Sequence, residues 1–404
     1  MSVNGLAGNA GTAASPITLV WALSAASPQI KAAKVRRIIL RGGTYSLAAT
    51  ISPSLAGTAA APWIISAYPG EYPVINIDTS ARHGFLYTSD SASFHEWHDI
   101  RFTDQSNRNG SVAYQLVKFD KGNSVGFVGC QFDNCRHSGF IVNGPARGIW
   151  LYGCLFLNNG SDAQFDHSMY LKSQAGITVE NSFMVGNSGH GVHGYNSSTS
   201  SSEAIRGFRI IGNSIFTYGE PQDRFILFQD SGVAKGVNDC WAIGNICYNA
   251  WPGVDATDRD RSSIKIVNGT NSRIEDNQVW GGDVVMVGGN PTVLRNKTVP
   301  SGNWAGLQSW VRPSRYDTNL AHVTIFNPDM ADNVGVDLDG KFPNGAYEIR
   351  AASSPQRVCA RGTYEGGAVS FPMTNLVYEA QMRVGGFNWK GSAKANGFVI
   401  RRFP

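Results

Sequence analysis

Short runs of alternating apolar and polar residues recur along the chain between residues 83 and 296. They include "GFIVN" (139–143), "GITVENSF" (176–183), "FRIIGNSIF" (208–216) and "RFILFQD" (224–230). Glycine, asparagine, aspartate and serine separate the runs, and no run carries an apolar stripe of helical length. The pattern therefore predicts short β-strands joined by tight turns.

An asparagine returns at a fixed interval within this region. The copies are Asn181, Asn213, Asn245 and Asn277, each 32 residues after the one before (213 − 181, 245 − 213 and 277 − 245). Cys130 and Cys154 take the same place in two earlier runs, "VGCQF" and "YGCLF". A repeat of this length predicts a solenoid, and its short strands favour a parallel β-helix with asparagines stacked at the bends.

Six runs align on one strand of each coil. They are "YQLVKFD" (114–120), "HSGFIVN" (137–143), "HSMYLKS" (167–173), "HGVHGYN" (190–196), "RFILFQD" (224–230) and "SSIKIVN" (262–268). Successive side chains of a strand point to opposite faces. The expected inward pairs are Gly139/Ile141, Met169/Leu171, Val192/Gly194, Ile226/Phe228 and Ile264/Ile266. The expected outward residues are Tyr170, Lys172, His193, Tyr195, Leu227, Gln229 and Lys265.

The rest of the chain is expected to close the two ends of the solenoid. Residues 1–34 contain one apolar segment (15–33) that could form a capping helix, which would cover the open end of the core. The β-helix is expected over 35–300 and a linker over 301–318. Residues 319–404 are interpreted as an appended all-β, sandwich-like module with a supporting role.

The first predicted strands carry a family resemblance. "ILRGGTYSLAATI" followed by "GTAAAPWIISAYPGEYPVI" resembles the first coils of right-handed parallel β-helix proteins of the pectate-lyase-like superfamily. That superfamily includes polysaccharide lyases of the chondroitinase-B-like and alginate-lyase-like kinds. The resemblance covers roughly 40 residues. It implies an all-β, right-handed parallel β-helix, and it favours an activity on polysaccharides.

Composition narrows the classes of partner. The chain has 404 residues, of which 16% are charged, and a net charge of +4 without a block of lysine or arginine, so nucleic acid is not expected as a partner. No stretch is long and apolar enough to cross a membrane, and the first residues lack the features of a signal peptide. The six cysteines show no metal-type spacing; stacked free thiols are expected, with a Cys240–Cys247 or other disulfide as the alternative.

Titratable side chains gather on four neighbouring coils. His137, His167, His190 and Arg224 open these coils, and Tyr170, Lys172, His193, Tyr195 and Gln229 follow on the outward face. Loops at 196–204, 218–223 and 251–261 would wall a groove beside this face. The alternative is structural: the histidines could cap turns, the tyrosines could form a surface stack, and the lysines could be solvated charges.

The cluster suits β-elimination from a uronate polymer. The C5 proton becomes acidic only when the adjoining carboxylate is neutralised, by Lys172 or Arg224 or by a metal. His193 or Tyr195 could remove that proton, and Tyr170 or His167 could protonate the leaving oxygen. Further substrate contacts are expected from His190, Gln229, Asp230 and Lys265. We therefore expect a polysaccharide lyase that acts on an acidic glycan, with a secreted or periplasmic location and an unknown oligomeric state.

Three alternatives remain open. "GHG" (189–191) and "IK" (264–265) faintly resemble polygalacturonase-type glycosidases, but hydrolysis needs paired carboxylates, and only Asp162, Asp166, Asp223 and Asp230 are scattered nearby. No cofactor is required, although Asp166 and Asp223, with Asp230 and the loop acids Asp255, Asp258 and Asp260, could bind Ca²⁺. The third alternative is a non-catalytic glycan-binding or adhesin solenoid.

Overall fold

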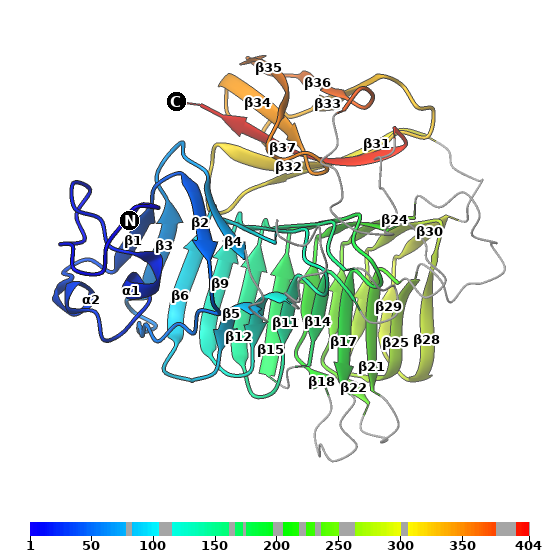
Figure 1. The fold of residues 1–404 in the computed structure, drawn as a ribbon. Coiled ribbons are helices and arrows are strands. Elements are labelled where there is room, and N and C mark those ends of the chain that lie inside the picture. Colours follow the sequence, from blue (N-terminus) through cyan, green and yellow to red (C-terminus); the bar gives the residue numbers. More distant parts are fainter. Residues whose placement is uncertain are drawn as a thin grey trace.

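The computed structural model describes residues 1–77, 83–104, 115–160, 166–172, 175–196, 205–217, 224–230, 236–249, 263–299, 306–376 and 393–403. Its main body is a right-handed parallel β-helix, in which most coils give one strand to each of three parallel sheets (Figure 1). The predicted fold class is therefore confirmed. No helix within these ranges is long and apolar enough to cross a membrane.

Sheet 1 has ten strands in a single spatial order. They are β1 (Arg37–Leu40), β3 (Trp63–Ala67), β6 (Ser93–His98), β9 (Asn123–Val128), β12 (Arg147–Tyr152), β15 (Ala175–Glu180), β19 (Arg209–Ile211), β23 (Trp241–Ile243), β26 (Arg273–Glu275) and β29 (Thr292–Leu294). Sheet 2 also has ten. They are β2 (Gly43–Leu47), β4 (Pro73–Ile77), β7 (Arg101–Thr103), β10 (Gln131–Asp133), β13 (Leu155–Leu157), β16 (Phe183–Val185), β20 (Ser214–Thr217), β24 (Ile246–Asn249), β27 (Gln278–Trp280) and β30 (Lys297–Val299).

Sheet 3 carries most of the predicted site residues. Its strands are β5 (His83–Tyr87), β8 (Gln115–Phe119), β11 (Phe140–Val142), β14 (Met169–Leu171), β17 (Val192–Asn196), β21 (Ile226–Asp230), β25 (Ser263–Thr270) and β28 (Asp283–Gly289), with β22 (Val237–Asn238) and β18 (Ile205–Arg206) beyond β25. Two short helices, α1 (Leu19–Ala22) and α2 (Pro28–Ala32), lie at the N-terminal end. Leu19 and Ala22 of α1 join the solenoid core, so the segment contributes to the core with two short helices in place of the single helix expected over 15–33.

The core consists of stacked side chains from successive coils. Phe102, Phe132 and Phe156 occupy equivalent places on neighbouring strands of sheet 2. Their rings stack with centroids 5.1 Å and 4.8 Å apart. Each coil thus covers the apolar face of the next, which is how a solenoid buries its core. All six cysteines are free, and five of them are buried.

A ladder of asparagines runs through the core at one bend. Asn213, Asn245, Asn277 and Asn296 are linked because the backbone N–H and the side-chain amide of each donate to the Oδ1 of the next. The prediction was wrong by one residue for Asn181. Ser182 takes the place in the ladder that was predicted for Asn181, and its backbone N–H donates to Asn213 Oδ1 at 2.9 Å.

Replacing Asn245 by alanine is expected to lower the free energy of unfolding by about 3 kcal/mol. Asn245 is fully buried, and its Oδ1 accepts from both Asn213 nitrogens, so these donors would be left unpaired inside the core. Chemical denaturation would measure the loss, with the exposed Asn333→Ala variant as the control. Equal stability of the two variants would mean that the ladder contributes little.

The residues of sheet 3 that point into the core are those predicted in four of the five strands. Met169, Val192, Ile226 and Ile264 are in register and buried. The prediction was wrong for residues 137–143. Phe140, not Gly139, pairs with Met169, so Phe140 and Val142 point into the core and Ile141 points out. All three residues of this strand are apolar, and apolarity alone could not set the phase.

A C-terminal module packs along the outer face of sheet 2 (Figure 1). It contains an antiparallel sheet of β31 (Gln308–Pro313), β32 (Leu320–Phe326), β37 (Ala395–Arg402), β34 (Gly345–Ala351) and β35 (Val358–Tyr364), together with a two-stranded antiparallel sheet of β33 (Asn333–Asp337) and β36 (Ala368–Pro372). Strand β31 lies inside the segment 301–318 that the sequence suggested as a linker. The module has its own core, and a second apolar cluster, including Phe183, Trp280 and Phe326, joins it to sheet 2.

Candidate active site on the outer face of sheet 3

The structure brings the central outward residues together. Tyr170 on β14 pairs with His193 on β17, which pairs with Leu227 on β21 and then with Lys265 on β25. Lys172 follows the end of β14, on the same face as Tyr170, and Tyr195 pairs with Gln229 in the equivalent row. Because strands alternate, these residues share one outer face of sheet 3. Leu227 separates Lys265 from His193, so Lys265 lies at the edge of the group.

Three histidines form the centre of the site. The rings of His167 and His190 are parallel, with centroids 4.6 Å apart. The ring of His193 stands at nearly a right angle to both, at 4.6 Å and 4.7 Å. Tyr170 and Tyr195 flank His193, with ring centroids 5.2 Å and 5.0 Å from it. His167 and His190 are buried, whereas His193 and the tyrosines are partly exposed.

Backbone amides fix the protons of the buried pair. The N–H of His190 donates to His167 Nδ1, and the N–H of Arg224 donates to His190 Nδ1, each at 3.1 Å. An amide N–H can only donate, so both Nδ1 atoms are bare and each neutral ring carries its proton on Nε2. His167 Nε2 lies 2.8 Å from His193 Nδ1 and must be the donor. Neutral His193 therefore also carries its proton on Nε2.

Burial keeps all three rings neutral. It lowers the pKa of His167 to about 4. The pKa values of His190 and His193 are held well below their ordinary range, mainly by burial and further by the neighbouring His167 and Arg224. His193 Nε2 is buried and has no hydrogen-bond partner within the described ranges. This N–H is thus an unpaired donor among the described residues.

The tyrosine and the lysine beside His193 are also perturbed. Burial, with Tyr195 as a smaller cause, raises the pKa of Tyr170 well above its ordinary range, so Tyr170 stays protonated. Lys172 Nζ lies 4.8 Å from the centroid of the Tyr170 ring. Partial burial, followed by the charge of Lys118, lowers the pKa of Lys172. Lys118 lies on the same face, in "YQLVKFD", but was not among the predicted site residues.

The three histidines do not fit a metal ion in this arrangement. One nitrogen from each lies within 4.8 Å of the other two, which is a compatible spacing. However, His167 and His190 already use Nδ1 as an acceptor, so binding a metal through Nε2 would require both rings to lose their only proton. Metal-binding histidines instead keep the proton on the nitrogen that does not bind the metal.

Only some of the predicted calcium ligands lie within the described ranges. The Asp166 carboxylate is buried and lies 2.6 Å from His137 Nδ1, a pairing that the sequence did not indicate. Asp223 lies outside the described ranges, as do Asp162, Asp255, Asp258 and Asp260. Calcium binding therefore stays a prediction. His137 does not join the three-histidine group, because its coil is shifted by one residue.

The remaining predicted residues lie around this centre. Arg224 is the residue whose N–H fixes the proton on His190. Gln229 and Asp230 lie on β21 opposite Tyr195 and Asn196. The loops expected to wall a groove (196–204, 218–223 and 251–261) fall almost wholly outside the described ranges.

The fold and the geometry define a right-handed parallel β-helix protein with a cluster of histidine, tyrosine and lysine on one outer face. No family model matches the chain. No curated protein matches it either. Among solved structures, an alginate lyase from Paenibacillus sp. str. FPU-7 is similar at 16% identity and a TM-score of 0.42, over 68% of this chain and 92% of the other.

Two further similar structures are known. The A-module of the mannuronan C-5 epimerase AlgE4 from Azotobacter vinelandii shows 13% identity and a TM-score of 0.40, over 74% of this chain and 95% of the other. The surface adhesin PfbA of Streptococcus pneumoniae shows 12% identity and a TM-score of 0.37, over 66% and 83%. At these identities no residue role can be transferred to this chain.

Proposed function

We propose that the protein is a polysaccharide lyase that cleaves an acidic, uronate-containing glycan by β-elimination on the outer face of sheet 3. The observation that carries the proposal is the grouping of Tyr170, Lys172 and Tyr195 around His193, whose ring proton is fixed on Nε2. A substrate of this kind lies outside the cell, so a secreted or periplasmic location is part of the proposal.

Lys172 and His193 would neutralise the uronate carboxylate. The Lys172 ammonium supplies a positive charge, and the His193 Nε2–H supplies a hydrogen bond from a preorganised, buried group. Preorganised donors of this kind stabilise charge that develops on oxygen as the C5 proton leaves. His167 acts through His193: it accepts the His190 amide and donates to His193 Nδ1, so it is a positioning residue.

The two tyrosines would transfer the protons. His193 does not remove the C5 proton in this arrangement. Its only unprotonated nitrogen, Nδ1, already accepts a hydrogen bond from the His167 N–H. Tyr195 as a phenolate would accept the C5 proton, and the C–H electron pair would form the C4=C5 double bond as the C4–O bond breaks. Tyr170, which burial keeps protonated, would give its proton to the leaving oxygen.

The role of His193 can be tested by comparing two substitutions. His193→Leu removes the donor and is expected to lower kcat by about 10²- to 10³-fold. His193→Gln keeps an amide N–H near the position of Nε2 and is expected to recover a large part of that loss. Formation of unsaturated uronate ends, followed by ultraviolet absorbance, measures both variants. If Gln is as inactive as Leu, His193 is acting as a base and the assignment fails.

A non-catalytic glycan-binding protein is the second candidate. The partly exposed rings of Tyr170 and Tyr195, 6.3 Å apart, could bind sugar faces without chemistry. A panel of uronate polysaccharides separates the two functions. A lyase shortens one of the polymers and produces ultraviolet-absorbing ends, whereas a binding protein retains the polymer at its original length.

A further inference from the structure

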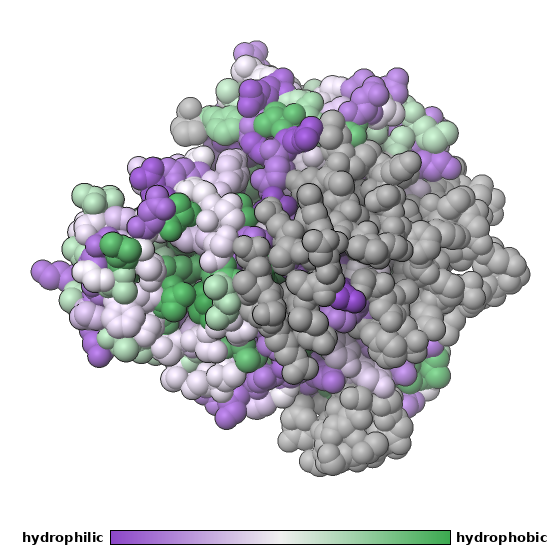
Figure 2. Space-filling model, viewed as in Figure 1, coloured by the Kyte–Doolittle hydropathy of each residue, from purple (hydrophilic) through white to green (hydrophobic). Residues whose placement is uncertain are grey.

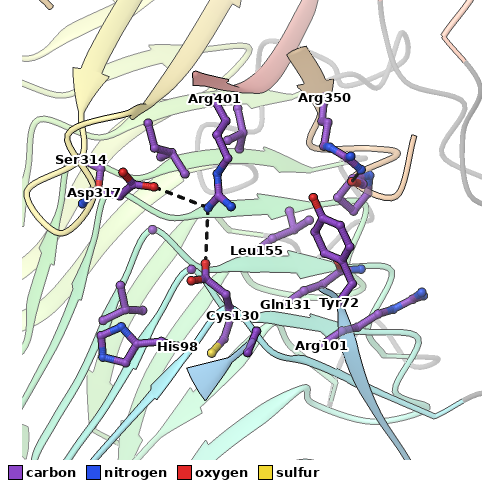
Figure 3. A pocket seen from close by; sticks show the side chains of 18 of the residues that line it. Tyr72, His98, Arg101, Cys130, Gln131, Leu155, Ser314, Asp317, Arg350 and Arg401 are labelled. Carbon is purple, nitrogen blue, oxygen red and sulfur yellow. Dashed lines mark hydrogen bonds and ion pairs between the residues drawn. The ribbon is translucent and has the colours of Figure 1, made fainter. Parts of the chain in front are cut away.

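A large pocket lies far from sheet 3, where the C-terminal module meets the corner between sheets 1 and 2. Its volume is about 880 Å³, within the range of small-molecule sites. The turn between β3 and β4 contributes Tyr68 and Tyr72, the solenoid contributes Arg101, and the module contributes Arg350 and Arg401 (Figure 3). None of its lining residues belongs to a strand of sheet 3.

Exposed aromatic rings are concentrated in this pocket. The four most exposed aromatic side chains within the described ranges are Tyr72 (52%), Tyr68 (45%), Tyr316 (43%) and Phe403 (40%), and all four line it. Figure 2 shows further apolar patches toward the N-terminal end of the molecule. The exposed large apolar residues of the first 35 residues are aliphatic: Val3, Leu6, Val20 and Val35. Aromatic rings that offer one face to solvent are suited to stacking on sugar rings.

The polar lining matches a ligand rich in hydroxyl groups. Arg401 Nη2 lies 3.5 Å from Asp99 Oδ1 and 3.9 Å from Asp317 Oδ2, which is wider than a direct charge-assisted hydrogen bond. Figure 3 shows Arg401 reaching down from the module toward these carboxylates. A hydroxyl or water oxygen that lies to one side of these loose ion pairs can accept from the guanidinium and donate to a carboxylate.

Two further arginines of the pocket are paired with carboxylates, whereas Arg402, which also lines it, has no carboxylate partner among the described residues. Arg350 Nε bonds to Glu348 at 2.7 Å, and its guanidinium lies 5.2 Å from the centroid of the Tyr72 ring. Arg101 is paired with Asp133 at 2.6 Å. Such paired groups act as hydrogen-bond donors and acceptors rather than as one net charge. Donors and acceptors in one lining favour a saccharide, whose hydroxyl groups both donate and accept.

We propose that this pocket is a second saccharide-binding site, distinct from the face of sheet 3. One sugar ring stacks on the face of Tyr72 that Arg350 does not cover, and its hydroxyl groups bond to Arg401, Asp99 and Asp317 at the edge of their loose ion pairs. The site holds a segment of a glycan chain at the junction of the module and the solenoid. This would give the module a direct part in retaining a polymer.

The test measures polymer binding in a Lys172→Ala background, in which cleavage is suppressed. Alginate, polygalacturonate and dextran are each cast in native gels, and the retardation of the protein gives its affinity. Tyr72→Ala is expected to weaken binding of at least one polymer about fivefold, because an aromatic stacking contact is lost. Tyr72→Phe keeps the ring and is expected to bind nearly as the parent does.

Leu294→Ala is the matched control, since Leu294 is a similarly exposed side chain (46%) outside the pocket. The proposal is overturned if Tyr72→Ala binds as tightly as the control, or if none of the three polymers retards the parent protein. These outcomes do not depend on cleavage. Failure of the pocket and failure of the lyase proposal are thus seen in different measurements.

Discussion

Replacing Lys172 by alanine is expected to lower kcat about 10³-fold, with a smaller change in KM. Lys172 is the cation of the group on sheet 3 that lies against the Tyr170 ring. Without this charge, the carboxylate of the substrate would resist the extra electron density that follows loss of the C5 proton. The rate of appearance of unsaturated uronate ends measures the effect.

The pH profile gives an independent readout of the same residue. The pKa of Lys172 is lowered, mainly by burial and then by Lys118, so its charge is lost at a lower pH than in an ordinary lysine. Activity should therefore decline earlier on the alkaline side. Lys118→Ala is the matched variant: it should raise the pKa of Lys172 and move the decline to higher pH. Full activity in Lys172→Ala, or an unmoved profile in Lys118→Ala, would count against the assignment.

Mild acid is expected to destabilise the folded protein strongly, because several histidines are buried in the neutral form. Burial lowers the pKa of His95 and of His167 to about 4, and that of His322 to about 3. Below the ordinary histidine pKa of 6.5, the unfolded chain binds protons that the folded chain cannot. Stability therefore falls as pH drops from 6.5 until the folded-state pKa is reached. At pH 5, each histidine should cost about 2 kcal/mol relative to pH 7.

His322 offers a specific test of this effect. It lies between the module and the solenoid, where its Nδ1 accepts a hydrogen bond from Asn181 Nδ2 at 2.8 Å. His322→Asn keeps an acceptor near that position but cannot be protonated. Urea unfolding at pH 7 and pH 5 should show a loss of stability smaller by about 2 kcal/mol in the variant. An equal loss in both proteins would show that His322 does not titrate on unfolding.

The sequence predicted the fold because the same pattern of apolar and turn residues recurs in successive coils. The alternating apolar residues form the stacked strands of the structure. Asn213, Asn245 and Asn277, which are 32 residues apart, form the hydrogen-bonded ladder. Errors of one residue arose where the pattern was ambiguous. The "FIV" strand is apolar in either phase. Asn181, with a φ of 50°, takes the left-handed position that Gly212 takes in the next coil, so Ser182 takes the place in the ladder.

The residue types on the outer face of sheet 3 were set by the sequence alone, because strand alternation places Tyr170, Lys172 and His193 on one side whatever surrounds them. Only the tertiary structure decided the proton positions. The backbone amides that fix the ring protons of His167 and His190 belong to His190 and Arg224, each one coil further along. The sequence around each histidine does not indicate these contacts between coils. The pocket beside Tyr72 and Arg401 likewise exists only because the module folds back onto the first coils, more than 300 residues away along the chain (401 − 72 = 329).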